Sequence, residues 1–193
     1  MNFPIRYNSP VTLTFALLCV GVAAVCHLIP SIRTNFFVLC SNSWLVTNPL
    51  DYFRIFSSTV GHADWSHLMG NMSIFLLIAP IVEEKYGGRQ VAMMMFFTSL
   101  VTGAIQILFM HQCSLGASGL VFMFIILVSF ADARKGSIPL TFVLVTVFYL
   151  GREFISAFDA NRVSEYAHIM GGAFGGLFGF FMRPVPKIAD SVA

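Results

Sequence analysis

The chain has 193 residues, of which 57% are hydrophobic and only 10% are charged, and its net charge is +2. Soluble domains carry roughly 25% charged residues, so this chain has too few charges to cover a water-exposed surface. The small, dispersed net charge also argues against nucleic-acid binding. We therefore predict that hydrocarbon surrounds most of the molecule.

Six segments are apolar over roughly the 20 residues that a membrane-spanning helix needs. No strand-like alternation is visible, and helices satisfy their own backbone hydrogen bonds in lipid. We predict an all-α membrane protein, with one domain over residues 1–193 that is a bundle of six transmembrane helices. The helices are predicted at residues 10–29, 66–82, 90–110, 117–133, 137–156 and 166–182.

The connections are short except for residues 30–65, between the first two helices. That segment holds aromatic residues of the kind found at a headgroup interface, namely Phe36, Phe37, Trp44 and Trp65. We predict an interfacial loop that lies on or partly in the membrane. Lys and Arg are more numerous in the segments that share a side with the N-terminus, so both termini are predicted to be cytoplasmic.

The cysteines Cys19, Cys26, Cys40 and Cys113 form no CxxC pair and no metal-binding spacing. Cys40 and Cys113 could share one side of the membrane, but the sequence favours two free thiols over a disulfide between them.

All nine acidic residues fall in predicted loops or near helix ends. This excludes an aspartyl intramembrane protease and weakens the case for a proton-coupled transporter, because both need carboxylates at membrane depth. The HExxH motif of metalloproteases is absent. A zinc site from His62, Asp64 and His67 is conceivable, but the spacing is not diagnostic. We predict no metal and no cofactor.

Polar residues at membrane depth are costly and therefore mark candidate functional sites. The first is Gly116-Ala117-Ser118-Gly119, which opens the predicted fourth helix after an outer loop. This helix is short for a span, so its start is predicted to lie in a depression that water can enter. Small neighbours let a substrate backbone approach Ser118, and the helix N-terminus favours developing negative charge. The alternative is that these small residues only pack helices.

The second candidate is His168, on the predicted sixth helix. Five glycines follow at offsets of +3, +4, +7, +8 and +11 and share its face: Gly171, Gly172, Gly175, Gly176 and Gly179. A bare glycine face lets a neighbouring helix come very close. If that neighbour is the fourth helix, Ser118 and His168 can form a serine–histidine pair. The alternative is a glycine packing face with an incidental histidine.

The third candidate is the pair His67 and Asn71, at positions i and i+4 of the predicted second helix. Two donors aimed the same way could stabilise an oxyanion. Alternatively, they could anchor the long outer loop. His62 and His111 are assigned no role.

In combination these motifs resemble the rhomboid intramembrane serine proteases, and the chain resembles the short bacterial GlpG type over roughly residues 5–183. The matching motifs are His67 to Asn71 for the family's HxxxN, Gly116 to Gly119 for its GxSG, Ala167-His168 followed by Gly171 and Gly175 for its AH…GxxxG, and Val82 to Gly87 for its turn after the second helix.

The resemblance implies the six-helix rhomboid bundle, with Ser118 as nucleophile and His168 as general base. It implies that His67, Asn71 and the Ser118 amide line an oxyanion hole, beside the structural glycines Gly116, Gly119, Gly171 and Gly175. The expected activity is hydrolysis of transmembrane protein substrates in the lipid bilayer of a bacterial inner membrane, at a site open to the outer side. It also implies that the fifth helix moves to admit substrates. Because no buried acid is available to orient His168, we predict a dyad rather than a triad.

Two positions depart from the family pattern. Phe53-Arg54 stands where the family has Trp-Arg, and Phe122 stands where a tyrosine is common, although Phe122 could still stack on His168. Two other functions stay open. One is an inactive relative that binds transmembrane clients. The other is a small transporter lined by His67, Asn71, Gln106 and His168.

Overall fold

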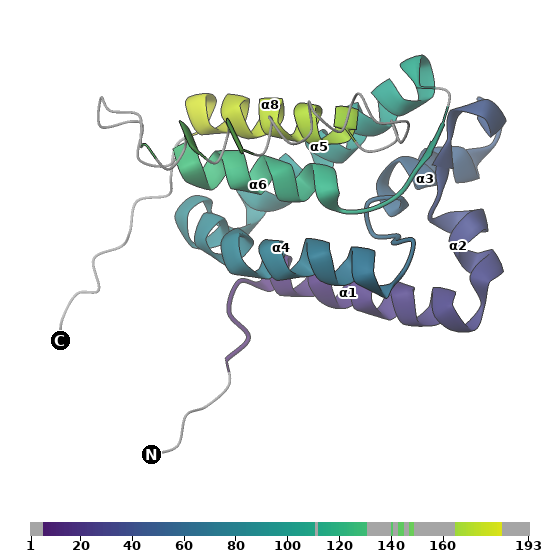
Figure 1. The fold of residues 1–193 in the computed structure, drawn as a ribbon, viewed down its shortest axis with the longest axis horizontal. Helices are drawn as coiled ribbons and strands as arrows, with labels where there is room; N and C mark the ends of the chain where they lie inside the picture. Colours follow the sequence, from purple (N-terminus) through teal and green to yellow (C-terminus); the bar gives the residue numbers. More distant parts are fainter. Residues whose placement is uncertain are drawn as a thin grey trace.

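The computed structural model describes residues 6–110, 112–130, 140, 143–144, 147–148 and 165–182. Their elements in chain order are α1 (Pro10–Leu28), α2 (Pro30–Phe36), β1 (Leu39–Cys40), the 3-10 turn η1 (Ser41–Ser43), α3 (Pro49–Ser57), α4 (Trp65–Tyr86), α5 (Gly88–Phe109), β2 (Cys113–Ser114), α6 (Ser118–Phe130) and α8 (Glu165–Phe181). Helix α1 packs on α4, α4 on α6 and α6 on α8, while α2 and α3 lie at one end of this stack (Figure 1).

Within the described residues, three helices are long and apolar enough to cross a membrane: α1, α4 and α5. They correspond to the predicted spans 10–29, 66–82 and 90–110. A shorter apolar helix covers Ser118–Ser129, where the span 117–133 is predicted, and α8 covers the predicted 166–182. The predicted fifth span, 137–156, lies outside the described residues except for five helical positions between 140 and 148.

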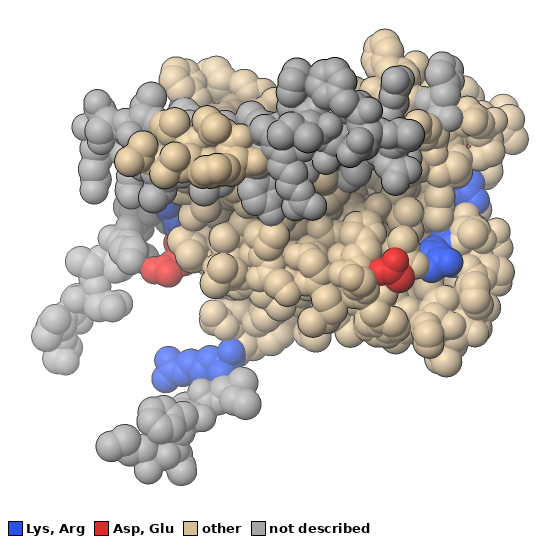
Figure 2. Space-filling view, viewed as in Figure 1, with Lys and Arg blue, Asp and Glu red and all other residues tan. Residues whose placement is uncertain are grey.

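The surface is that of a protein whose solvent is lipid. Large apolar side chains such as Leu77, Leu108 and Phe180 are about 70% exposed, which a water-soluble protein avoids over wide areas. Figure 2 shows that the charged side chains of this face lie toward the two ends of the molecule, with an uncharged zone between them. The interior is packed with equally apolar groups, among them the edge-to-face rings of Phe75 and Phe124, with centroids 5.3 Å apart.

Helix α4 extends four residues beyond the predicted end at 82, because Glu83 has a partner on α1. The Glu83 carboxylate accepts hydrogen bonds from the backbone N–H of Val11 (2.9 Å), the N–H of Thr12 (2.8 Å) and the Thr12 hydroxyl (2.7 Å). Ser9, at the start of α1, provides no side-chain cap. The carboxylate therefore satisfies the free N–H groups at the N-terminus of α1, where negative charge is favourable.

Residues 30–65, predicted as an interfacial loop, form the folded unit that contains α2, β1, η1 and α3. Arg54 holds this unit together: its Nε donates to the carbonyl of Asn35 (2.9 Å), at the end of α2, and its guanidinium pairs with the buried Asp51. Asp51 also accepts the N–H of Leu45 at 3.0 Å. Arg54, on α3, thus joins α3 to α2.

One prediction is wrong at the contact between this unit and the segment before α6, where the mostly helical fold also contains two short strands. Strands β1 and β2 form an antiparallel pair of two residues each. Their register sets Cys40 opposite Cys113, and the two form a disulfide rather than two free thiols. The cysteines are 73 positions apart, and only the tertiary fold brings their strands together.

Candidate active site

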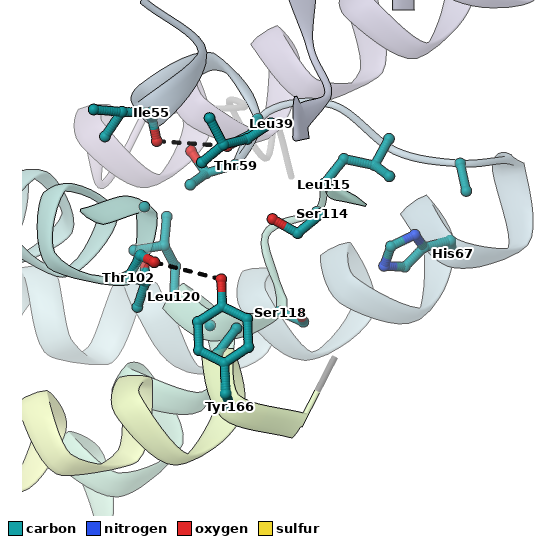
Figure 3. Close-up of a pocket in the computed structure, with 16 residues that line it drawn as sticks. Leu39, Ile55, Thr59, His67, Thr102, Ser114, Leu115, Ser118, Leu120 and Tyr166 are labelled. Carbon is teal, nitrogen blue, oxygen red and sulfur yellow. Dashed lines mark hydrogen bonds between the residues drawn. The ribbon is translucent and has the colours of Figure 1, made fainter. Parts of the chain in front are cut away.

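A cavity of about 190 Å³ lies at the end of the bundle opposite the N-terminus of α1. Its walls come from β1, α3, the start of α4, α5, the residues 114–116, the first turn of α6 and the start of α8. Ser118 and His67 are among its lining residues (Figure 3), together with Gly116 and Gly119. The structure therefore gathers four of the candidate site residues around one hollow.

Helix α6 begins at Ser118, after a sharp turn at Gly116 whose φ is +124°. At that φ a side chain is strained, and a Cβ at Gly116 would lie 2.7 Å from Cε1 and 2.9 Å from Nε2 of His67. The Gly116 N–H donates to the carbonyl of Ser58 at 2.8 Å. Only glycine fits here, and its backbone brings the segment before Ser118 directly against the His67 ring.

His67 and Asn71 lie one turn apart on α4, close to its N-terminus. Asp64 caps this end by accepting the His67 N–H at 2.8 Å, which fixes where the helix starts. Asn71 is 8% exposed, and its Nδ2 has no hydrogen-bond partner among the described residues. The same Nδ2 would lie 3.7 Å from a Cβ at Gly116. A buried amide donor therefore lies beside the turn that leads to Ser118.

The neighbour of the glycine face of α8 is α6, and the two backbones touch. A Cβ at Gly171 would overlap the carbonyl oxygen of Gly119, and a Cβ at Gly175 would overlap that of Met123. In the other direction, a Cβ at Gly119 would lie 3.1 Å from the carbonyl oxygen of Ala167. Residues 119 and 167 directly follow Ser118 and precede His168, so the close approach occurs beside both candidate residues.

The His168 ring stacks on Phe122, with ring centroids 5.4 Å apart and an interplanar angle of 12°. This contact confirms the predicted stacking. Phe122 follows Ser118 by four residues on α6, and residues with that spacing share a helix face. The imidazole therefore lies against the side of α6 that carries Ser118.

The sequence indicated no role for two further residues near the site. Tyr166 lines the cavity, and its hydroxyl donates to the Thr102 carbonyl on α5 at 3.4 Å (Figure 3). His62 is buried, its Nδ1 lies 3.0 Å from the Val60 carbonyl, and its ring contacts the His67 ring edge-on. Burial lowers the pKa of His62 to about 4. Neither residue belongs to a periodic pattern. The only signal in the sequence was that Tyr166 is two positions before His168 and His62 is five positions before His67.

The conceivable zinc site from His62, Asp64 and His67 has no counterpart in the structure. Across the described part of the chain, no group of three His, Cys, Asp or Glu side chains is arranged to hold a metal ion.

The candidate residues His67, Asn71, Ser118 and His168 all fall within the region of the chain that matches a known family. The model of the Rhomboid domain matches residues 49–185, which is more than half of the chain. The rhomboid protease GlpG of Haemophilus influenzae is 25% identical over 140 residues, which are 71% of this chain and 73% of that protein. The chloroplastic rhomboid-like protein 11 of Arabidopsis thaliana is 29% identical over 145 residues, 72% of this chain but 47% of the plant protein, so the match spans about half of that relative.

Proposed function

Because this chain belongs to the rhomboid family, we propose that it is an intramembrane serine endopeptidase, which hydrolyses peptide bonds in or near the transmembrane segments of other membrane proteins. The observation that carries the proposal is the backbone contact of α6 with α8, together with the His168 ring stacked on Phe122 one turn beyond Ser118. This arrangement favours a nucleophile and a base that act as a pair.

In the proposed mechanism, His168 takes the proton of the Ser118 hydroxyl as the oxygen attacks the substrate carbonyl. Negative charge then develops on the carbonyl oxygen, and three donors stabilise it: Nδ2 of Asn71, the ring of His67 and the backbone N–H of Ser118. His168 returns the proton to the leaving amine, and an acyl-enzyme remains on Ser118. Water activated by His168 then releases the acyl group.

The cavity beside Ser118 supports the hydrolytic step. Residues that carry hydroxyl groups line it from several segments of the chain, among them Ser58, Thr102, Ser114 and Tyr166. A cavity of about 190 Å³ with several polar partners has room for ordered water. The cavity can therefore hold the water molecule that attacks the acyl-enzyme at Ser118.

The membrane topology and the cellular location are part of the same proposal. We infer six membrane spans, cytoplasmic termini, an α2–α3 unit at the membrane interface, and a cavity that opens to the outer side of a bacterial inner membrane. The Cys40–Cys113 disulfide supports this orientation, since it lies at the cavity end of the bundle and disulfides persist in oxidising compartments. The seven basic residues that share a side with the N-terminus, against four on the other side, agree with it.

Cleavage of a single-span reporter protein in detergent or proteoliposomes tests the proposal. The wild type should cleave the reporter, and Ser118→Ala should abolish cleavage. Ser129→Ala is the matched control, because Ser129 is on the same helix and its hydroxyl donates to the Ile125 carbonyl of its own turn. Reporter binding without cleavage would instead identify an inactive client-binding relative, and solute uptake without cleavage would identify a transporter.

A further inference from the structure

The Cys40–Cys113 disulfide fastens the segment that leads to Ser118. Cys113 precedes Ser118 by five residues, and Cys40 belongs to the unit formed by α2, β1 and α3. The residues next to the disulfide on each strand, Leu39 and Ser114, both line the cavity. The disulfide therefore joins two strands, β1 and β2, that both contribute to the wall of the cavity.

Noncovalent contacts also hold residues 112–117, and Ala117 at the end of this segment is fully buried. The Gly116 N–H donates to the Ser58 carbonyl at 2.8 Å, and the Gln106 side chain donates to the Gln112 carbonyl. The pairing of β1 with β2 covers only two residues on each strand, and so short a ladder has little stability of its own. The covalent bond is thus the strongest tie between this segment and the rest of the molecule.

The disulfide can also be reached from outside. The Cys113 side chain is exposed and that of Cys40 is half-buried. A thiolate of an external dithiol can attack Sγ of Cys113, and Cys40 leaves as a thiolate that takes up a proton. The second thiol of the dithiol then resolves the mixed disulfide. The net reaction reduces the cystine to two thiols and oxidises the dithiol to its disulfide.

We propose that Cys40–Cys113 is a thiol–disulfide exchange site through which a dithiol reductant controls the order of residues 112–117 and, with it, the rate of peptide hydrolysis. The second half of this statement rests on the proposed function. Reduction leaves Gly116 and the Ser118 amide with weaker positional restraint beside His67 and Asn71. Displacement of catalytic groups by about 1 Å lowers rates by up to about 100-fold, so a loosened segment slows the chemical step.

The test uses the full chain with Cys19→Ala and Cys26→Ala, which removes the two buried free cysteines and leaves only the pair. The protein is compared after treatment with oxidised glutathione, after treatment with dithiothreitol, and after reoxidation. Maleimide-reactive thiols are counted by mass, hydrogen exchange is followed in peptides that cover residues 112–117, and reporter cleavage is timed. Cys40→Ser/Cys113→Ser in the same background is the control for effects of the reductant elsewhere.

We expect the thiol count to rise from zero to two on reduction, with faster exchange in residues 112–117. The turnover number should fall about 10- to 100-fold, with a smaller change in KM, and recover on reoxidation. The serine variant should stay at the low rate with or without reductant. If that variant does not fold, the reversible cycle on the parent protein still decides the matter.

Two thiols after oxidation, or equal exchange and equal turnover in both redox states, would overturn the inference. If the oxidised protein shows no Ser118-dependent cleavage, the proposed function fails. In that case hydrogen exchange alone still decides whether the disulfide orders the segment.

Discussion

Gly119 of α6 and Gly171 of α8 meet backbone to backbone, so closely that a Cβ on Gly171 would overlap the carbonyl oxygen of Gly119 and lie 3.2 Å from its Cα. A carbonyl in a helix cannot move aside as the end of a flexible side chain can. The distance between α6 and α8 is therefore set by the absence of a side chain at position 171. Ser118 directly precedes Gly119 on α6, and His168 lies one turn before Gly171 on α8.

Gly171→Ala should force α6 and α8 apart and lower both stability and activity. Overpacking of this kind costs about 1–3 kcal/mol, and reporter cleavage should fall by at least about tenfold because the dyad geometry is lost. Gly176→Ala is the matched control, since no neighbouring atom of the described residues lies within 4 Å of a Cβ there. Thermal unfolding and cleavage rates measure both effects. Equal melting temperatures and equal cleavage rates of the two variants would show that the α6–α8 contact does not determine the geometry of the site.

Gly116→Ala should reduce activity with little effect on global stability. The residue is in a loop with φ of +124°, and the added methyl would meet the His67 ring at 2.7 Å. We expect a loss in kcat of about 100-fold, from displacement of the Ser118 amide and His67. Gly70→Ala is the control, because Gly70 lies between His67 and Asn71 on α4 and a Cβ there would meet none of the described side chains within 4 Å. A fully active Gly116→Ala variant would contradict the proposed role of this turn.

Asn71→Ala should separate catalysis from folding. Removal of one oxyanion donor typically lowers kcat by about 10²–10³-fold. A residue kept for stability would also lower the melting temperature when truncated, but Nδ2 of Asn71 has no partner to lose among the described residues. We expect a large fall in kcat with a nearly unchanged melting temperature. The reverse pattern, lower stability with normal kcat, would assign Asn71 to loop anchoring.

His62 should make the folded state less stable in acid. Burial lowers its pKa from 6.5 to about 4, so the folded protein keeps this ring neutral while the unfolded chain binds a proton below pH 6.5. The folded state loses no stability from this ring above pH 6.5. Below that pH the free energy of unfolding declines as the pH falls toward 4, by at most about 3 kcal/mol. Unfolding free energies of the wild type should therefore drop over this window. In His62→Gln the part of the slope due to this ring should vanish, and an unchanged slope would show that His62 does not titrate in this way.

The sequence predicted the spanning helices α1, α4 and α5 because hydropathy alone defines a spanning segment. The ends of α1 and α5 match the predicted ends within two residues. The end of α4 does not, since Val82 to Gly87 was matched to the family's turn after the second helix. The helix instead continues to Tyr86, and the Glu83 carboxylate is buried against Thr12. A charged side chain with a distant partner has no signature in local sequence.

The site could be assembled from motifs because its residues lie on helices with regular spacing. The glycines after His168 predicted a close helix contact, and the structure places it against α6. The disulfide, the packing of residues 30–65 and the positions of His62 and Tyr166 depend on contacts between segments far apart in the chain. Only coordinates supply such contacts, and for this reason the sequence favoured free thiols at Cys40 and Cys113.

The proposed mechanism depends on activation of Ser118 by His168. The rate at which a fluorophosphonate modifies Ser118 measures this activation, followed by intact mass in the wild type, in His168→Ala and in Ser118→Ala. We predict modification of the wild type, none in Ser118→Ala, and a decrease of at least about 100-fold in His168→Ala, the range of general-base assistance. Modification of His168→Ala at the wild-type rate would show that Ser118 is merely exposed and that His168 is not its base.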